Sequence, residues 1–176
     1  MNLERDVAAA TTALFAINVD GVFNTVLPLL EAMKERKTGR IVLMSSLAAT
    51  APMPGAAAYS ASKAAIRTYG EALRGLVYRD GLRVNVICPG YVESDMTAAN
   101  KSPMPGLMTM DVAVRIMTRG LARDVPVIQF PTSLHTVMWG LARVLPPGLM
   151  HALARRRAIP VLGYLRPRRA CKSAAK

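Results

Sequence analysis

The chain is poor in the residues that build disulfides and metal sites. Its two cysteines, Cys88 and Cys171, lie far apart without metal-ligand spacing, so free thiols in a reducing compartment are expected. The two histidines, His135 and His151, have no third candidate ligand nearby, and no metal site is expected. Residues 1–6 carry charges where a signal peptide needs an apolar run, which indicates a cytoplasmic protein.

Acidic residues are scarce in the last third of the chain. Residues 1–114 hold 11 basic and 10 acidic residues, whereas residues 115–176 hold 12 basic residues and one acidic residue, Asp124. The net charge of +12 therefore lies almost wholly in the C-terminal part, where it concerns a partner surface rather than chemistry. With 176 residues, 52% of them hydrophobic, and a mean hydropathy of +0.24, the chain is expected to form one globular domain.

The hydrophobic pattern predicts alternating helices and strands. One long helix is expected from Asp6 to Glu35, kinked at Pro28. The apolar run Arg40–Ser46 shows almost no alternation, which is typical of an interior parallel strand covered on both faces. The later predicted elements are a helix from Tyr59 to about Arg79, a strand at Arg83–Cys88, a helix capped by Asp111 that runs to about Ala122, and a strand at Val125–Phe130.

The segment Tyr59-Ser60-Ala61-Ser62-Lys63 carries the main chemical signal. In a helix, Tyr59 and Lys63 leave the same face one turn apart. A free tyrosine, with a pKa of about 10, exchanges protons poorly at neutral pH, and a fixed ammonium nearby favours its phenolate form. Such a pair could therefore act as a general acid and base. Ser60 and Ser62 are expected to be helix-start hydroxyls.

Three other features accompany this pair in a fixed order. Asn18 lies in the first helix, Ser46 ends the strand before Tyr59, and Pro89-Gly90 closes the strand after it. Together these features resemble the catalytic half of a short-chain dehydrogenase/reductase of the compact branch, over Asn18–Thr97. The resemblance implies an NAD(P)-dependent oxidoreductase that moves a hydride between a nicotinamide cofactor and a small-molecule carbonyl or alcohol.

The resemblance also assigns roles to individual residues. It implies that Tyr59 is the general acid/base, that Lys63 tunes it and binds the nicotinamide ribose, that Ser46 holds the reacting oxygen, and that Asn18 holds a relay water. Ser45, next to Ser46, is expected to be structural. The loop Pro89–Ser94 would meet the nicotinamide, so the implied cofactor-binding residues are Tyr59, Lys63, Pro89, Gly90, Val92 and Ser94. A homo-oligomer is implied as well, through the Tyr59 helix and the helix before it.

One feature of dinucleotide-binding proteins is missing. The sequence has no glycine-rich G-x-x-x-G-x-G turn after an opening strand, and no Asn-Asn-Ala-Gly strand. We therefore expect the resemblance to cover only the C-terminal catalytic half, with the glycine-rich cofactor half absent. About three strands then remain, the Arg40–Ser46 strand exposes an unpaired edge, and the choice between NAD and NADP stays open.

The predicted fold class is α/β: a partial Rossmann-like, doubly wound parallel sheet with a helical, basic C-terminal extension. Residues 1–130 form the catalytic part and residues 131–176 the extension. Residues 98–110, with two prolines and three methionines, resemble a lid over an apolar substrate, although plain packing also explains the methionines.

The extension has an apolar face, Trp139 and a cationic polar face. It would pack on its own domain or another subunit, or make peripheral contact with a membrane. Nucleic acid is not expected as a partner, because the basic residues lack interleaved aromatics. As an alternative to the enzyme, the chain is a truncated, inactive fragment that serves as an oligomerisation or membrane-associating module.

Overall fold

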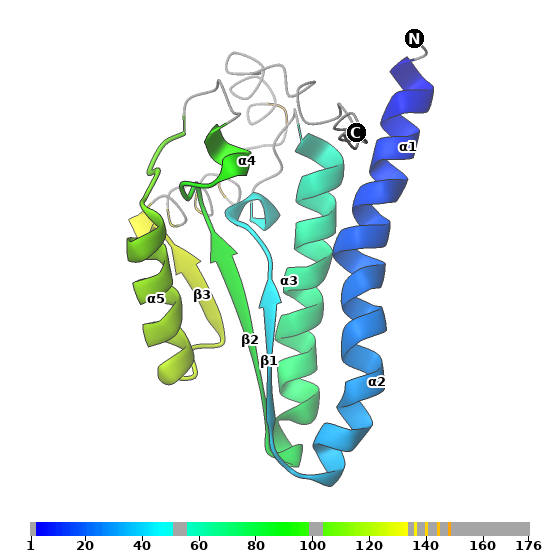
Figure 1. Cartoon of the computed structure of the whole chain (residues 1–176), viewed down its shortest axis with the longest axis vertical. Coiled ribbons are helices and arrows are strands. Elements are labelled where there is room, and N and C mark those ends of the chain that lie inside the picture. The colour runs from blue at the N-terminus through cyan, green and yellow to red at the C-terminus, as the bar shows by residue number, and fades with distance from the viewer. Residues whose placement is uncertain are drawn as a thin grey trace, which may run out of the picture.

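The computed structural model describes residues 3–50, 56–98 and 104–133, together with Thr136, Gly140, Val144 and Gly148 as single positions. Figure 1 shows a parallel sheet flanked by helices on both faces. The predicted α/β class with a three-stranded, Rossmann-like parallel sheet is confirmed. The basic extension from residue 134 onward, residues 99–103 of the expected lid, and Cys171 lie outside the described residues apart from those single positions.

The N-terminal helix runs almost without a break from residue 3 to residue 35, as predicted, but its irregularity is not where we expected it. The helix consists of α1 (Leu3–Phe15), a π-helical turn η1 (Ala16–Asp20) and α2 (Gly21–Glu35). Pro28 lies within α2. Asn18 is the middle residue of the π-turn, and such turns are frequent at functional sites because they re-aim side chains.

The three strands are β1 (Gly39–Met44), β2 (Leu82–Pro89) and β3 (Val127–Phe130), in the order β1-β2-β3. All pairs are parallel, with Ile41 opposite Val84 and Ile87 opposite Ile128. β1 lies at the edge of the described sheet, so the predicted unpaired edge of this strand is confirmed, whereas the prediction that the strand is covered on both faces is wrong. It also ends before Ser45, and its residues alternate: Val42 is 41% and Met44 49% exposed.

The helices cover opposite faces of the sheet. The helix α3 (Ala57–Val77) packs on the face that presents Leu43 and Val86, together with α2. The helix α5 (Met110–Ala122) packs on the other face, over Ile87 and Ile128 (Figure 1). Its cap is Thr109 rather than Asp111, which lies in the first turn of the helix. The Asp111 cap prediction is therefore wrong by two positions.

Gly70 sets the distance between α3 and the sheet. A Cβ at this position would lie 2.5 Å from Val86 Cγ2 and 2.9 Å from Leu43 Cδ1. Only a residue without a side chain lets the backbone of α3 approach both strands so closely. Because the first turn of the same helix carries Tyr59 and Lys63, this contact also fixes how near those side chains lie to the end of β1.

A groove of about 500 Å³ runs along the free edge of β1. It is lined by apolar and small residues of the N-terminal helix, among them Ile17, Val22 and Leu29, and by Arg40–Leu43. The segment Val7–Glu35 is also long and apolar enough to cross a membrane, with only 17% of the most apolar window buried. Long apolar helices of other origins meet the same criterion, so this length alone assigns no membrane role.

The amino ends of the strands are joined by one charged cluster around Asp124. The Asp124 carboxylate accepts hydrogen bonds from Arg74 at 2.7 and 3.0 Å and from Asn85 Nδ2 at 3.1 Å, and it pairs with Arg83 at 3.2 Å. The Arg74 hydrogen bonds outweigh partial burial and lower the pKa of Asp124 from 3.8 to about 2. Asp124 has a φ of 52°, which aspartate tolerates better than most residues.

Candidate active site

The predicted catalytic residues come from three elements that meet near the carboxyl ends of β1 and β2. The chain leaves β1 through Ser45 and Ser46, forms a short 3-10 turn η2 (Leu47–Ala49), and later enters α3 just before Tyr59. The carboxyl end of β2 leads into Pro89 and Gly90. The carboxyl ends of parallel strands are where open α/β sheets bind their ligands.

Tyr59 and Lys63 lie one turn apart in the first two turns of α3, as the sequence predicted. The Lys63 ammonium lies 5.8 Å from the centre of the Tyr59 ring and donates a hydrogen bond of 3.1 Å to the Met44 carbonyl at the end of β1. Both side chains are half-buried. Burial lowers the pKa of Lys63, because it disfavours the charged form. The ammonium therefore occupies a partly dry position with one backbone ligand.

The two serines after β1 have different environments. Ser45 is buried, and its hydroxyl donates a 2.7 Å hydrogen bond to the Lys63 carbonyl, which ties the strand to α3. Ser46 is half-buried, and its hydroxyl accepts a 3.2 Å hydrogen bond from Ala48 N–H, as the cap of the η2 turn. Both contacts are compatible with the predicted assignment of Ser45 as structural and of Ser46 as the residue that faces substrate.

Asn18 reaches α3 from the π-turn. Its Nδ2 donates a 3.0 Å hydrogen bond to Ser62 Oγ, and Ser62 Oγ donates a 2.9 Å hydrogen bond to the Tyr59 carbonyl. Ser62 is fully buried. The expectation that Ser62 is a helix-start hydroxyl therefore misses its contact with Asn18. Ser60 is buried as well.

The loop after β2 is held close to this region. The backbone N–H of Gly90 donates a 2.7 Å hydrogen bond to the Phe130 carbonyl, and a Cβ on Gly90 would lie 3.0 Å from Pro131 Cδ and 3.3 Å from Leu47 Cδ1. Tyr91 lies near Tyr59: burial raises the pKa of Tyr91, and the neighbouring Tyr59 raises it further. A glycine at position 90 thus keeps the loop against both η2 and β3.

Val92 and Met108 join the loop to the end of the predicted lid segment, residues 98–110. The Tyr91 carbonyl accepts from Met108 N–H at 3.1 Å, and Glu93 N–H donates to the Met108 carbonyl at 3.0 Å. In this bridge the N–H and C=O of Val92 point to the opposite side. The Val92 carbonyl accepts a 2.8 Å hydrogen bond from Thr97 Oγ1. The Val92 N–H donates no hydrogen bond within the part of the chain that the structure describes.

Ser94 has a local role in the described structure. It is exposed, its hydroxyl accepts a 3.3 Å hydrogen bond from Thr97 N–H, and it stands directly before the short helix α4 (Asp95–Ala98). None of its hydrogen bonds among the described residues reaches Tyr59, Lys63 or Ser46. The structure thus shows Ser94 as a helix cap and leaves its predicted contact with cofactor as a prediction.

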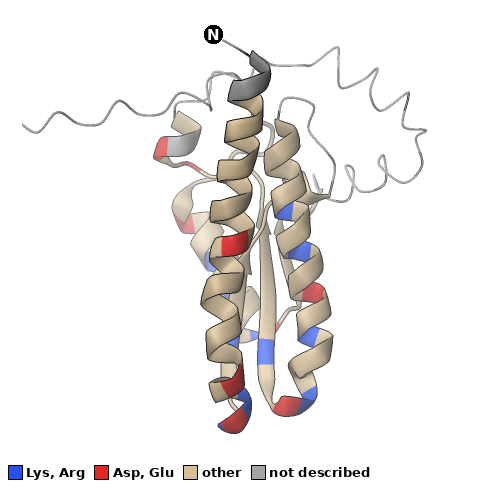
Figure 2. Cartoon of the chain, turned by 90° about the vertical axis from the view of Figure 1, so that its right-hand side faces the viewer, with Lys and Arg blue, Asp and Glu red and all other residues tan. Residues whose placement is uncertain are grey.

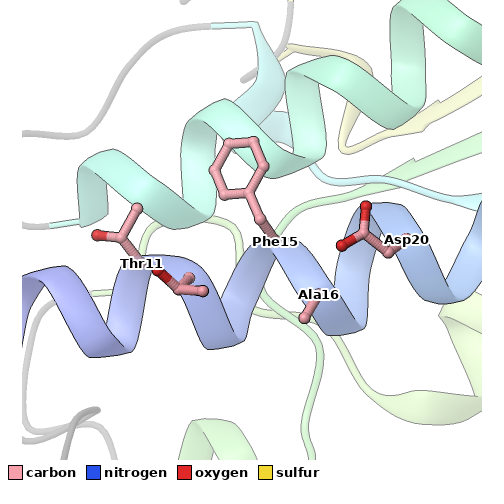
Figure 3. A pocket seen from close by; sticks show the side chains of 5 residues that line it. Thr11, Phe15, Ala16 and Asp20 are labelled. Carbon is pink, nitrogen blue, oxygen red and sulfur yellow. The ribbon is translucent and has the colours of Figure 1, made fainter.

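A second hollow lies along α1 and the π-turn. Figure 3 shows the side chains that line it, among them Thr11, Phe15 and Asp20, all from this one helix. Thr11 and Thr12 both donate their hydroxyls to carbonyls of their own helix. Because none of the predicted catalytic residues lines this hollow, it is distinct from the candidate active site.

Comparisons with known proteins identify the family. The model of the short chain dehydrogenase family matches residues 2–105, which is more than half of the chain. The chain belongs to the short chain dehydrogenase family. An uncharacterised oxidoreductase of Myxococcus xanthus is 45% identical over 139 residues, a match that covers 79% of this chain and 54% of that protein.

Solved structures of the family agree on the fold. A short chain dehydrogenase from Burkholderia cenocepacia in complex with NADP is 22% identical, with a TM-score of 0.69, covering 85% of this chain and 61% of that one. A 3-oxoacyl-[acyl-carrier protein] reductase from Brucella melitensis with bound NAD is 26% identical, with a TM-score of 0.56, covering 69% and 49%. The chain spans about half the length of the curated relatives it matches.

The family match corrects one prediction. We expected the resemblance to be confined to a catalytic half that begins just before the helix that carries Asn18, with the cofactor half absent. The family model instead matches from residue 2 onward, so α1 and the residues up to 105 belong to the Rossmann cofactor-binding part of the family's domain. The division into a retained catalytic half and a lost cofactor half is therefore wrong.

Ser62 is the residue that sequence reasoning missed at this site. It stands on the same stripe of α3 as Ile66, Gly70, Leu73 and Val77, all of which are buried. This spacing of three and four residues marks one face of a helix. A lone hydroxyl on an otherwise apolar or small stripe was a readable sign of a buried hydrogen bond, because a buried polar group requires a partner.

Proposed function

We propose that this protein is an NAD(P)-dependent oxidoreductase that transfers a hydride between a nicotinamide cofactor and the carbonyl or alcohol carbon of an apolar small molecule. The observation that carries the proposal is the position of Tyr59 and Lys63 at the carboxyl end of a parallel sheet, beside Ser46 and the Gly90 loop, in a chain of this family. The bound NADP and NAD of the two solved relatives support the cofactor class and leave the choice between them open.

The residues present fit the nicotinamide end of such a cofactor. The half-buried Lys63 ammonium has one backbone ligand, the Met44 carbonyl, which leaves further N–H donors for ribose hydroxyls. The Val92 N–H points away from the Met108 bridge and suits a carboxamide oxygen. Pro89 and Gly90 hold this loop against β3. When bound, the cofactor supplies or accepts the hydride.

The protein's own part is to hold the substrate oxygen and to move its proton. In the proposed mechanism Tyr59 gives a proton to the carbonyl oxygen during reduction and takes it back during oxidation, while the Lys63 ammonium stabilises the phenolate left behind. The Ser46 hydroxyl donates a hydrogen bond to the same oxygen. Asn18 holds a water that returns a proton to the Tyr59 region.

The proposal is tested on the purified full chain in two steps. Titration with NADH and with NADPH, followed by cofactor fluorescence, measures binding. Turnover is then assayed with acetoacetyl-CoA and with apolar ketones, since one relative is a 3-oxoacyl reductase. Tyr59→Phe is expected to reduce turnover by roughly 1,000-fold while cofactor stays bound. Tyr78→Phe, at the exposed far end of α3, serves as the matched control.

The proposal fails if the chain binds neither cofactor at millimolar concentration. Tyr59 loses its assigned role if Tyr59→Phe and Tyr78→Phe turn over equally fast. A strong difference between NADH and NADPH would also resolve the cofactor choice, which the sequence leaves undetermined.

We further propose that the partner of the long helices is a second copy of the chain. Leu27 on α2 is 55% exposed and Leu76 on α3 is 71% exposed. Figure 2 shows the face that these helices form: the N-terminal helix has few charges above its lower end, whereas α3 carries charged residues at several levels along its length. Sedimentation equilibrium of the wild type and of Leu27→Glu and Leu76→Glu would test this, and a wild-type monomer would exclude it.

A further inference from the structure

Ser62 has an unusual position among the polar residues near Tyr59. Serine hydroxyls in helices often bond a carbonyl three or four residues earlier, and the bond to the Tyr59 carbonyl alone would be of that ordinary kind. Ser62 differs from such serines because its oxygen has a second hydrogen-bond partner. Asn18, from a different helix and 44 positions earlier in the chain, donates to the same oxygen at 3.0 Å.

The direction of these two hydrogen bonds is fixed by their chemistry. A carbonyl only accepts, so the single hydroxyl proton of Ser62 goes to the Tyr59 carbonyl, and the Ser62 oxygen can then only accept from Asn18. Asn18 must therefore present its Nδ2 group to Ser62. Its Oδ1 and its second N–H proton are held at a fixed orientation for other partners.

We propose that Ser62 is a positioning residue of the active site, whose buried hydroxyl links the Asn18 amide to the helix turn that carries Tyr59. This inference rests on the proposed function. The hydroxyl fixes the π-turn relative to α3, so that a water held by Asn18 keeps a constant distance from the Tyr59 region. Because Ser62 is fully buried, no solvent molecule can replace the lost contact when the hydroxyl is removed.

A neighbouring serine shows why the role is specific to Ser62. Ser45 is buried to a similar degree and also donates to a carbonyl of α3, that of Lys63. Its bond ties α3 to the end of β1 and has no part in the Asn18 contact. The two serines therefore fix α3 in two directions, and only Ser62 reaches the π-turn.

The decisive experiment compares Asn18→Ala, Ser62→Ala and the double variant in steady-state kinetics with cofactor and substrate. If Ser62 acts through Asn18, Ser62→Ala lowers kcat by about 10-fold with little change in KM, and adds almost nothing in the Asn18→Ala background. Ser62→Thr keeps the hydroxyl and is expected to recover most of the lost kcat. Circular dichroism and urea unfolding of each variant confirm that it is folded.

Two kinetic outcomes would overturn the proposal. One is a wild-type kcat in Ser62→Ala. The other is an equal further loss when Ser62→Ala is added to Asn18→Ala, which would indicate a general structural effect.

A second readout does not depend on turnover. The side-chain amide protons of Asn18, identified in nitrogen-15 spectra by their loss in Asn18→Ala, are expected to exchange with solvent about 10-fold faster in Ser62→Ala than in wild type. Absence of wild-type turnover would refute the proposed function, and the exchange rates would then decide the Ser62 contact alone. Equal exchange in wild type and Ser62→Ala would overturn it.

Discussion

The two ends of the sheet use polar side chains in opposite ways. At the amino ends, the Asp124 carboxylate forms ion pairs with Arg74 and Arg83 and accepts a hydrogen bond from Asn85. Its negative charge is therefore paired with positive charges. At the carboxyl ends, the Lys63 ammonium has one backbone carbonyl as its partner and no acidic side chain in its described contacts. The same helix, α3, supplies Arg74 to one end and Lys63 to the other.

The difference separates stability from function. A charge that is paired at several points contributes to folding and has little capacity left for a ligand. A half-buried ammonium with one neutral partner costs some folding free energy, which a bound ligand can offset. We therefore expect substitutions at the amino ends to change unfolding and those at the carboxyl ends to change binding.

Gly70→Ala is expected to disturb both ends, because Gly70 sets the approach of α3 to the sheet. The new methyl group would lie 2.5 Å from Val86 Cγ2, and we expect a loss of about 2 to 3 kcal/mol in urea unfolding. Gly75→Ala is the matched control, since nothing lies within 4 Å of the new Cβ. There an exposed helical glycine becomes alanine, with a gain of about 0.5 to 1 kcal/mol. Equal losses at both positions would contradict the packing argument.

Asp124→Asn is expected to destabilise the amino ends alone. Asparagine tolerates the φ of 52°, so the backbone is unchanged while the partly buried Arg74 loses its charge partner. We expect a loss of about 2 kcal/mol in urea unfolding and unchanged cofactor affinity. Asp80→Ala removes the same charge from the same end of the molecule, where no ion pair within the described residues involves it, and should cost little. A large drop in cofactor affinity for Asp124→Asn would show that the two ends are not separate.

The lowered pKa of Asp124 predicts that the free energy of unfolding falls in acid. Its pKa is lowered from 3.8 to about 2 in the folded protein, so the unfolded chain takes up the proton first as the pH falls. The stability from Asp124 is therefore complete above about pH 5 and is lost between about pH 4 and pH 2, by about 2 kcal/mol. Urea unfolding across this range should show a smaller acid loss in Asp124→Asn than in wild type. If the unfolding free energies of wild type and Asp124→Asn fall in parallel with pH, Asp124 does not cause the acid loss.

Lys63→Met is expected to change stability least and binding most. Burial lowers the pKa of Lys63 below 10.5, so the unfolded chain binds this proton more tightly and wild-type stability should rise slightly with alkaline pH up to that value. Methionine removes that rise and changes the unfolding free energy by less than about 1 kcal/mol. Cofactor affinity should fall at least about 10-fold. Retained affinity in Lys63→Met would exclude a role of the ammonium in binding.

The sequence was most informative where a contact is local. Tyr59 and Lys63 are four positions apart, so helical spacing alone predicted that they share a face, and the strand after α3 was predicted within one residue at each end. Specific contacts between distant residues, outside the site that the family resemblance implied, were not predicted. Arg74 and Asp124 are 50 positions apart, and nothing in their own segments indicates that they meet.

The apolar run in β1 misled us for a related reason. A continuous stretch such as Ile41-Val42-Leu43-Met44 indicates that both faces can be buried, and the structure shows Val42 and Met44 exposed at the edge of the described sheet. The polarity of a side chain indicates whether it prefers a buried or an exposed position. It does not indicate which neighbouring element would bury it. The π-turn was missed likewise, because Ala16–Asp20 has the composition of an ordinary helix.

That turn has a consequence for how the site can be lost. A π-turn holds about one residue more than an α-helical turn, and the local widening takes up that residue. Deletion of a single codon within Ala16–Asp20 would restore a regular helix, remove the widening at Asn18 and break the contact between Asn18 and Ser62. The fold would persist while the site disappeared, so an inactive descendant of this protein lies one in-frame deletion away.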